Sequence, residues 1–145
     1  MASPSRHRRG LMERQREAGG SPVARPATVL VVEDAVLIRA ATSSYLRRCG
    51  LEVVEAVNAD EALELLRASD DIQAVFADVK LPGQRSGADL AHIIRDDYPK
   101  VKVLLTSGVA PFPDVEGVVL LRKPYFPFEV ERRLKSMLGL AGKPR

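Results

Sequence analysis

The sequence predicts an α/β domain in which a parallel sheet of five strands is covered by helices on both faces. Five apolar segments are typical of strands, and helical patterns separate most of them. The strand segments are continuous apolar runs without alternation, as expected for parallel strands that are buried on both faces. Strand–helix–strand units of this kind cross over with a right-handed sense, so the predicted sheet is doubly wound.

The composition predicts one folded domain with a basic tail before it. The chain has 145 residues, with 46% hydrophobic and 28% charged residues, which is ordinary for a single domain. Residues 1–26 are rich in Arg, Gly, Ser and Pro and low in apolar content, so we expect a disordered tail. Residues 27–141 then form the domain, and 142–145 form a short C-terminal tail.

The net charge of +3 is concentrated in that tail. Residues 1–26 hold six arginines and two glutamates, and the remainder has a net charge of −1. The basic pI therefore gives no reason to expect that the folded domain binds nucleic acid. No apolar stretch approaches the roughly 20 residues of a membrane span, and Cys49 is the only cysteine. We expect a cytoplasmic protein without a disulfide or a membrane span.

The first half of the domain alternates strand and helix. Thr28–Val32 is a β-branched apolar run, and Leu51–Ala56 is the second strand. Between them, Ala35–Cys49 is predicted to be a helix because apolar residues recur at helical spacing, at Val36, Leu37, Ala40, Ala41 and Tyr45. Asn58, with Glu61 three residues later, indicates the start of a second helix, which ends near Ser69.

The second half repeats this order with one interruption. Ile72–Ala77 is the third strand, and a helix capped by Ser86 runs to about Tyr98. The last two strands are Val101–Leu105 and Val118–Leu121, and Pro127 begins a final helix that continues to Leu138.

The connection between the last two strands is too short and too rich in proline for the expected helix. It covers 12 residues, 106–117, and includes Pro111 and Pro113. Proline lacks the N–H that a helix interior needs. We therefore expect a shortened or absent crossover helix, replaced by a loop with one turn of 3₁₀ helix.

Polar residues follow the strands at the edge where open parallel sheets bind their ligands. Glu33 and Asp34 follow the first strand, and Asp78 follows the third. Neighbouring carboxylates repel one another unless a cation or a proton lies among them, and their oxygens suit Mg²⁺. Thr106 and Lys123 follow the fourth and fifth strands. Each residue alone is more often a turn residue or a surface charge, but together they predict a site.

Four motifs carry a resemblance to a known family, and together they are highly specific. They are Val-Val-Glu33-Asp34, Asp78-Val-Lys-Leu-Pro-Gly, Leu-Leu-Thr106-Ser-Gly and Arg-Lys123-Pro124. On these motifs the chain resembles, over about residues 27–140, a response regulator receiver domain of two-component signalling, with a flavodoxin-like (CheY-like) fold. The wording of the motifs is similar to that of stand-alone receivers.

The resemblance implies that Asp78 is the phosphoacceptor. A sensor histidine kinase or a histidine phosphotransfer protein would donate the phosphoryl group. Mg²⁺ would be held by Asp34, by Asp78, by the backbone carbonyl of Lys80 and, largely through water, by Glu33. Self-catalysed acceptance of this kind is not enzymatic turnover.

The resemblance also implies a switch. Thr106 would bind a phosphoryl oxygen and move inward on phosphorylation. Lys123 would pair with Asp78 and then with the phosphoryl group, as a mobile point charge, and its bond to Pro124 is expected to be cis.

Two departures from the family pattern, Leu120 and the shortened fourth crossover, concern the output of that switch. The aromatic residue usually found three positions before Lys123 is Leu120 here, so the relay from threonine to aromatic ring is altered. Tyr125 is a possible substitute, although we expect Tyr125, Phe126 and Phe128 to pack the last helix. The loop 83–86 also contains one extra residue and borders the metal site.

Three functions compete on these residues. The first is a phosphoryl-accepting receiver without its own effector domain, which signals to an unknown target by protein contact or by phosphate relay. The alternative is a phosphate-independent interaction module on the same fold. A Mg²⁺-dependent phosphohydrolase is disfavoured, because Val79 and Lys80 follow Asp78 where such enzymes carry Asp-x-Asp, and because the chain has no room for a cap domain.

Overall fold

The predicted fold class is confirmed in residues 25–140, which are the residues that the computed structural model describes. The predicted tails, 1–26 and 142–145, lie outside them except for residues 25 and 26. The described part contains one parallel sheet with the strand order β2-β1-β3-β4-β5. The strands are β1 (Thr28–Val32), β2 (Glu52–Ala56), β3 (Ile72–Asp78), β4 (Lys102–Ser107) and β5 (Val118–Arg122).

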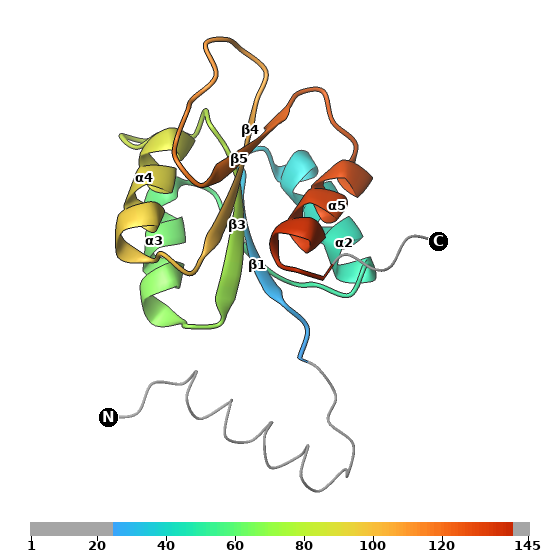
Figure 1. Cartoon of the computed structure of the whole chain (residues 1–145). Coiled ribbons are helices and arrows are strands. Elements are labelled where there is room, and N and C mark those ends of the chain that lie inside the picture. The colour runs from blue at the N-terminus through green and yellow to red at the C-terminus, as the bar shows by residue number, and fades with distance from the viewer. Residues whose placement is uncertain (1–24, 141–145) are drawn as a thin grey trace, which may run out of the picture.

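Helices cover both faces of the sheet, as Figure 1 shows. Helices α2 (Val36–Arg48) and α5 (Pro127–Met137) lie on one face, and α3 (Ala59–Ala68) and α4 (Gly87–Asp97) lie on the other. Alternate strand residues point to opposite faces. Val31 and Phe76 therefore pack under α2 and α5, while Leu30 and Val75 pack under α3 and α4.

Local sequence signals explain where the helices begin. The Asn58 side chain accepts a hydrogen bond from the Glu61 N–H at 2.8 Å and caps α3. Ser86 and Asp89 form a reciprocal capping box at the start of α4. Both caps are at the residues that the sequence predicted. Pro127 occupies the first turn of α5, where its missing N–H has no cost.

The apolar pattern that predicted α2 is not the face that this helix buries. Val36, Leu37, Ala40 and Ala41 are exposed, with Leu37 83% exposed, whereas Thr42, Ser43 and Leu46 are buried. The helical spacing therefore predicted the helix correctly, but it predicted the wrong side of the helix to be buried. The physical reason is position: the first turns of α2 lie at the carboxyl edge of the sheet, facing the segment between β5 and α5.

The connection between β4 and β5 contains no helix, as predicted, but the expected 3₁₀ turn is also absent. Residues 108–117, all of which are described, form bends and one tight turn. That turn is closed by the Val118 N–H, which donates to the Val115 carbonyl at 3.0 Å, and Gly117 adopts a φ of +79° within it. Val115 is buried in the core on the α4 side and anchors the segment.

No helix among the described residues has both the length and the apolar character that crossing a bilayer requires.

Candidate functional site

The parallel register brings the predicted site residues to one edge of the sheet. Glu33 and Asp34 directly follow β1, and Asp78 is the last residue of β3. Asp78 is in register with Thr106 on the neighbouring strand β4. Lys123 directly follows β5, and its N–H donates to the Ser107 carbonyl at 2.9 Å.

Asp78 is the buried centre of this edge. Its carboxylate oxygen Oδ1 accepts a hydrogen bond from the Lys80 N–H at 2.9 Å. The other oxygen, Oδ2, accepts from the Lys123 ammonium group and forms an ion pair with it. The Asp78 side chain is only 9% exposed, so the ion pair neutralises a carboxylate that water screens poorly.

The backbone of Asp78 is held by a close contact with Gly87, the first residue of α4. A Cβ atom added at Gly87 would lie 2.1 Å from the Asp78 carbonyl oxygen. The Gly87 N–H donates to the Val79 carbonyl at 2.7 Å. Sequence reasoning did not identify Gly87 as a site residue. The available signal was its position: a glycine directly follows the N-cap of a predicted helix, where no turn requires a glycine.

Glu33 is the buried member of the acid pair, and Asp34 is the exposed one. Burial raises the pKa of Glu33 above its ordinary value, and the neighbouring Asp34 and Asp78 raise it further. The Ala35 N–H, which donates to Glu33 Oε2 at 3.1 Å, and the Lys123 charge act in the opposite direction. The acids therefore interact with one another across the edge of the sheet.

Thr106 offers an unused polar group to the site. Its side chain is 1% exposed, and its hydroxyl Oγ1 has no hydrogen-bond partner within residues 25–140. Buried hydroxyls nearly always have a partner. An unpaired hydroxyl beside Asp78 is therefore ready to bind a group that is added there.

Lys123 is the basic group of the site, and its side chain is 35% exposed. Burial lowers the pKa of Lys123, but the hydrogen bond and charge of Asp78, together with Glu33, outweigh burial and raise it overall. The lysine is consequently charged at neutral pH. Its bond to Pro124 is cis, and its stem packs 3.4 Å from the position of a Cβ at Gly108.

The donor set has the chemistry of a Mg²⁺ site. Three carboxylates and backbone carbonyls at one sheet edge are hard oxygen ligands. Within the described residues, however, no three acidic, histidine or cysteine side chains lie close enough together to enclose a metal ion. The Asp78 carboxylate instead forms an ion pair with Lys123. The contact that involves Lys80 is made by its N–H, and its carbonyl remains a predicted ligand.

Leu120, at the usual aromatic position, and Tyr125, its possible substitute, lie on opposite faces of the sheet. Leu120 is opposite Leu105 and is half-buried on the α4 side. Tyr125 packs on the α5 side, where its ring meets Phe76 edge-on at 5.7 Å. The expectation that Phe126 also packs the last helix is wrong, because Phe126 is the N-cap residue before α5 and is 69% exposed, with its ring stacked on the exposed ring of Phe128.

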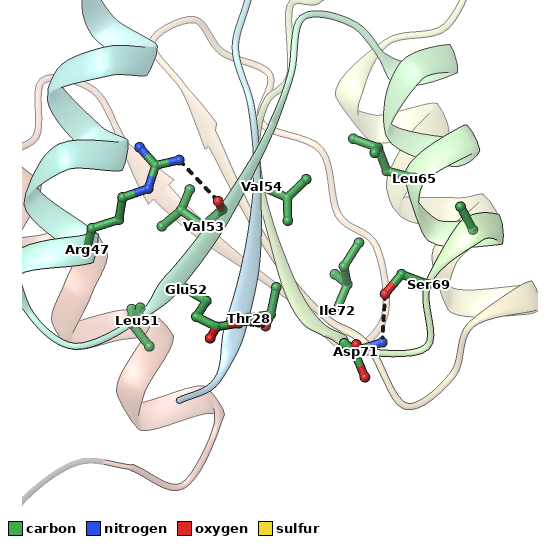
Figure 2. Close-up of a pocket in the computed structure, with 11 residues that line it drawn as sticks. Thr28, Arg47, Leu51, Glu52, Val53, Val54, Leu65, Ser69, Asp71 and Ile72 are labelled. Carbon is green, nitrogen blue, oxygen red and sulfur yellow. Dashed lines mark hydrogen bonds between the residues drawn. The ribbon is translucent and has the colours of Figure 1, made fainter. Parts of the chain in front are cut away.

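Two grooves differ in their relation to the site. One, of about 590 Å³, begins at Lys123 and Gly108 and runs between α2 and the segment before α5, lined by Leu37, Ile38, Ala41, Thr42, Pro124, Tyr125 and Pro127. The other, of about 640 Å³, lies at the opposite end of the strands beside β2 (Figure 2). None of the predicted site residues lines the second groove, so the first is the one that belongs to the site.

Comparisons with known proteins agree on one family. The family model for the response regulator receiver domain matches residues 29–121. The probable transcriptional regulatory protein TcrX of Mycobacterium tuberculosis is 32% identical over 133 residues, which cover 88% of this chain and 54% of TcrX. The sensor kinase CckA of Brucella abortus is 30% identical over 119 residues, which cover 77% of this chain and 12% of the kinase.

A solved structure gives the same result. The crystal structure of a response regulator receiver domain protein from Clostridium thermocellum matches with a TM-score of 0.72 at 25% identity, covering 78% of this chain and 94% of that chain. By contrast, the chain spans about half or less of the two curated relatives. The similarity therefore concerns one domain of those relatives.

Proposed function

This chain belongs to the response regulator receiver domain family of two-component systems, and we propose that it accepts a phosphoryl group on Asp78. Receiver domains are phosphoacceptors. The observation that carries the assignment to Asp78 is the pairing of its buried carboxylate with Lys123, beside the Thr106 hydroxyl, which has no hydrogen-bond partner among the described residues. A carboxylate with a purely structural role would need the ion pair with Lys123. It would not need a neighbouring hydroxyl that is left without a hydrogen-bond partner.

The proposed reaction is a transfer from a phosphohistidine. A bond forms between phosphorus and an Asp78 carboxylate oxygen, while the bond from phosphorus to the donor's histidine nitrogen breaks and its electron pair stays on that nitrogen. Lys123 then contacts the phosphoryl oxygens as well as the carboxylate, and Thr106 donates its hydroxyl hydrogen to one of them. The step needs positioning and charge neutralisation more than covalent chemistry from the protein.

The metal in this proposal is Mg²⁺, which receiver domains generally bind at the phosphorylation site. Asp34, Asp78 and the Lys80 carbonyl would hold it directly, and Glu33 largely through water. When bound, it reduces the repulsion between carboxylate and phosphoryl oxygens. Burial and the neighbouring acids raise the pKa of Glu33, and a divalent cation beside it would favour its charged carboxylate.

The proposed phosphodonor is a sensor histidine kinase or a histidine phosphotransfer protein. The apolar groove supports a protein donor, because it begins at Lys123 and is bordered by the exposed side chains of Leu37 and Ile38. Exposed apolar surface beside a reactive group is typical of a docking site. Output by protein contact or by phosphate relay to a further protein is part of the same proposal.

Phosphorylation of Asp78 can be tested directly. The purified protein is incubated with a small acyl phosphate and Mg²⁺, and intact-mass spectrometry measures the addition of one phosphoryl group. Asp78→Asn should abolish the addition, whereas Asp97→Asn, at the exposed end of α4, should leave it unchanged. Unmodified wild type, or an Asp78→Asn variant that is still modified, would contradict the proposal.

A phosphate-independent interaction module is the second candidate. Leu120 at the aromatic position and the missing helix between β4 and β5 favour it, since both concern the part of a receiver that reports phosphorylation. Equal binding of a partner to wild type and to Asp78→Asn would support this alternative. Steady release of phosphate from a generic ester would instead indicate a phosphohydrolase.

A further inference from the structure

Arg39, on α2, connects two strands beside the acid pair. Its guanidinium nitrogen Nη1 donates to the Glu33 carbonyl oxygen at 2.8 Å. Its Nε donates to Glu55 Oε1, on β2, at 3.2 Å. The Arg39 side chain is 17% exposed, so both contacts are largely protected from water. A half-buried arginine with two defined acceptors is held in one orientation.

The carbonyl that Arg39 holds belongs to the peptide bond between Glu33 and Asp34. Because that peptide group is planar, its orientation helps to set the directions in which both side chains leave the backbone. The Glu33 N–H is fixed separately by the Ala56 carbonyl at 3.0 Å, and the Glu33 side chain by the Ala35 N–H. Arg39 is thus the side chain that completes the fixation of the turn after β1.

Glu55 orients Arg39 from the other side. Its second oxygen, Oε2, accepts from Arg47 Nη2 at 3.1 Å. Arg47 also donates to the Val53 carbonyl, as Figure 2 shows, and its side chain is 49% exposed. Arg47 therefore shares Glu55 with Arg39 but, within residues 25–140, forms no hydrogen bond or ion pair with Glu33 or Asp34, which makes it a matched control.

We infer that Arg39 is a positioning residue that holds Glu33 and Asp34 in the geometry that binds the divalent cation. The inference rests on the proposed function, because it assigns Arg39 to the metal site of that reaction. Lysine is a poor substitute, since a single ammonium cannot reproduce a planar fork that reaches a carbonyl and a carboxylate on different strands.

The test measures Mg²⁺ binding by isothermal titration calorimetry on the unphosphorylated full chain. Residues that orient metal ligands typically change metal affinity 10–100-fold, so Arg39→Gln should raise the dissociation constant for Mg²⁺ at least about tenfold. Arg39→Lys and Glu55→Gln should raise it less, and Arg47→Gln should leave it at the wild-type value. With acyl phosphate as donor, Arg39→Gln should approach the wild-type phosphorylation rate at saturating Mg²⁺, since positioning affects binding more than the chemical step.

An unchanged Mg²⁺ dissociation constant in folded Arg39→Gln, or an equal rise in Arg47→Gln, would overturn the inference. If Arg39→Gln does not fold, as judged by circular dichroism, Arg39→Lys and Glu55→Gln decide in the same way. Failure of the proposed function is distinguishable, because it appears as wild-type protein that binds Mg²⁺ but acquires no phosphoryl group.

Discussion

The neighbouring strands β3 and β4 end side by side at the site, but the chain continues from them in opposite ways. After β3 it enters the capped helix α4, whose first residue, Gly87, packs against the Asp78 backbone. After β4 it forms an irregular segment in which Val115 is the buried anchor. The proposed phosphoacceptor therefore has a helix packed against its backbone, whereas the segment that follows Thr106 is anchored by one buried side chain. The two strand ends at the site are thus supported differently, one by a helix and the other by an irregular segment.

The contact between Gly87 and Asp78 gives the largest expected effect. In Gly87→Ala the Cβ would overlap the Asp78 carbonyl oxygen at 2.1 Å, so the backbone must move. Overpacking of this kind costs typically 1–3 kcal/mol and sometimes more, so we expect a loss of roughly 3 kcal/mol in the free energy of unfolding and slower phosphorylation. Urea denaturation and intact-mass spectrometry measure the two effects.

The matched control lies after β4. A Cβ at Gly108 would come no closer than 3.4 Å to Lys123, which is an ordinary contact. Gly108→Ala should therefore change stability and phosphorylation little. Equal losses in the two alanine variants would show that the two strand ends are supported alike.

The anchor of the β4–β5 segment gives an intermediate effect. Val115→Ala removes buried apolar surface under the sheet, which should lower the free energy of unfolding by about 1–2 kcal/mol. Val109→Ala, at an exposed position in the same segment, should lie within about 0.5 kcal/mol of wild type. Urea unfolding of both variants checks this, and an equal loss at both positions would contradict the anchoring role.

The acid at the end of β1 gives the smallest effect, and it depends on pH. Because the pKa of Glu33 is raised in the folded state, its contribution to stability is fully present below the ordinary value of 4.5 and is lost as pH rises through the raised value. Glu33→Gln should therefore match wild type at low pH and become the more stable protein at neutral pH.

Urea unfolding over a pH series, with a chelator present, measures this difference. Adding Mg²⁺ should reduce the advantage of Glu33→Gln, because the cation stabilises the charged carboxylate of the wild type. A difference between the two proteins that stays constant with pH would mean that Glu33 carries no electrostatic strain in the folded state.

Local signals made most of the fold predictable. Asn58 and Ser86 capped the helices that the sequence assigned to them, and the apolar runs located every strand to within one or two residues. The inner face of α2 was not predictable in this way, because its exposed apolar residues border a groove instead of packing in the core. Hydrophobic periodicity does not distinguish surface kept for a partner from surface kept for the core.

The candidate site was likewise predictable only in part. The residues at the strand ends were evident because parallel topology brings all carboxyl ends to one edge. Gly87 and Arg39 were not evident, because their contacts with the Asp78 backbone and the Glu33 carbonyl depend on how the loops after β3 and β1 fold. The 3₁₀ turn was wrongly predicted for a similar reason. Two prolines excluded a helix, but the packing of the buried Val115 determined the path of the segment.

The irregular segment between β4 and β5 also has a use in protein engineering. Its exposed residues, such as Val109, belong to no helix or strand, so an inserted sequence would interrupt neither. Doubling the length of a flexible loop costs only about 0.6 kcal/mol in closure entropy. A fluorescent or epitope-bearing peptide grafted between Val109 and Ala110 would sit a few residues from Thr106 while the anchor at Val115 remains in place, which makes this chain a candidate scaffold for a genetically encoded reporter.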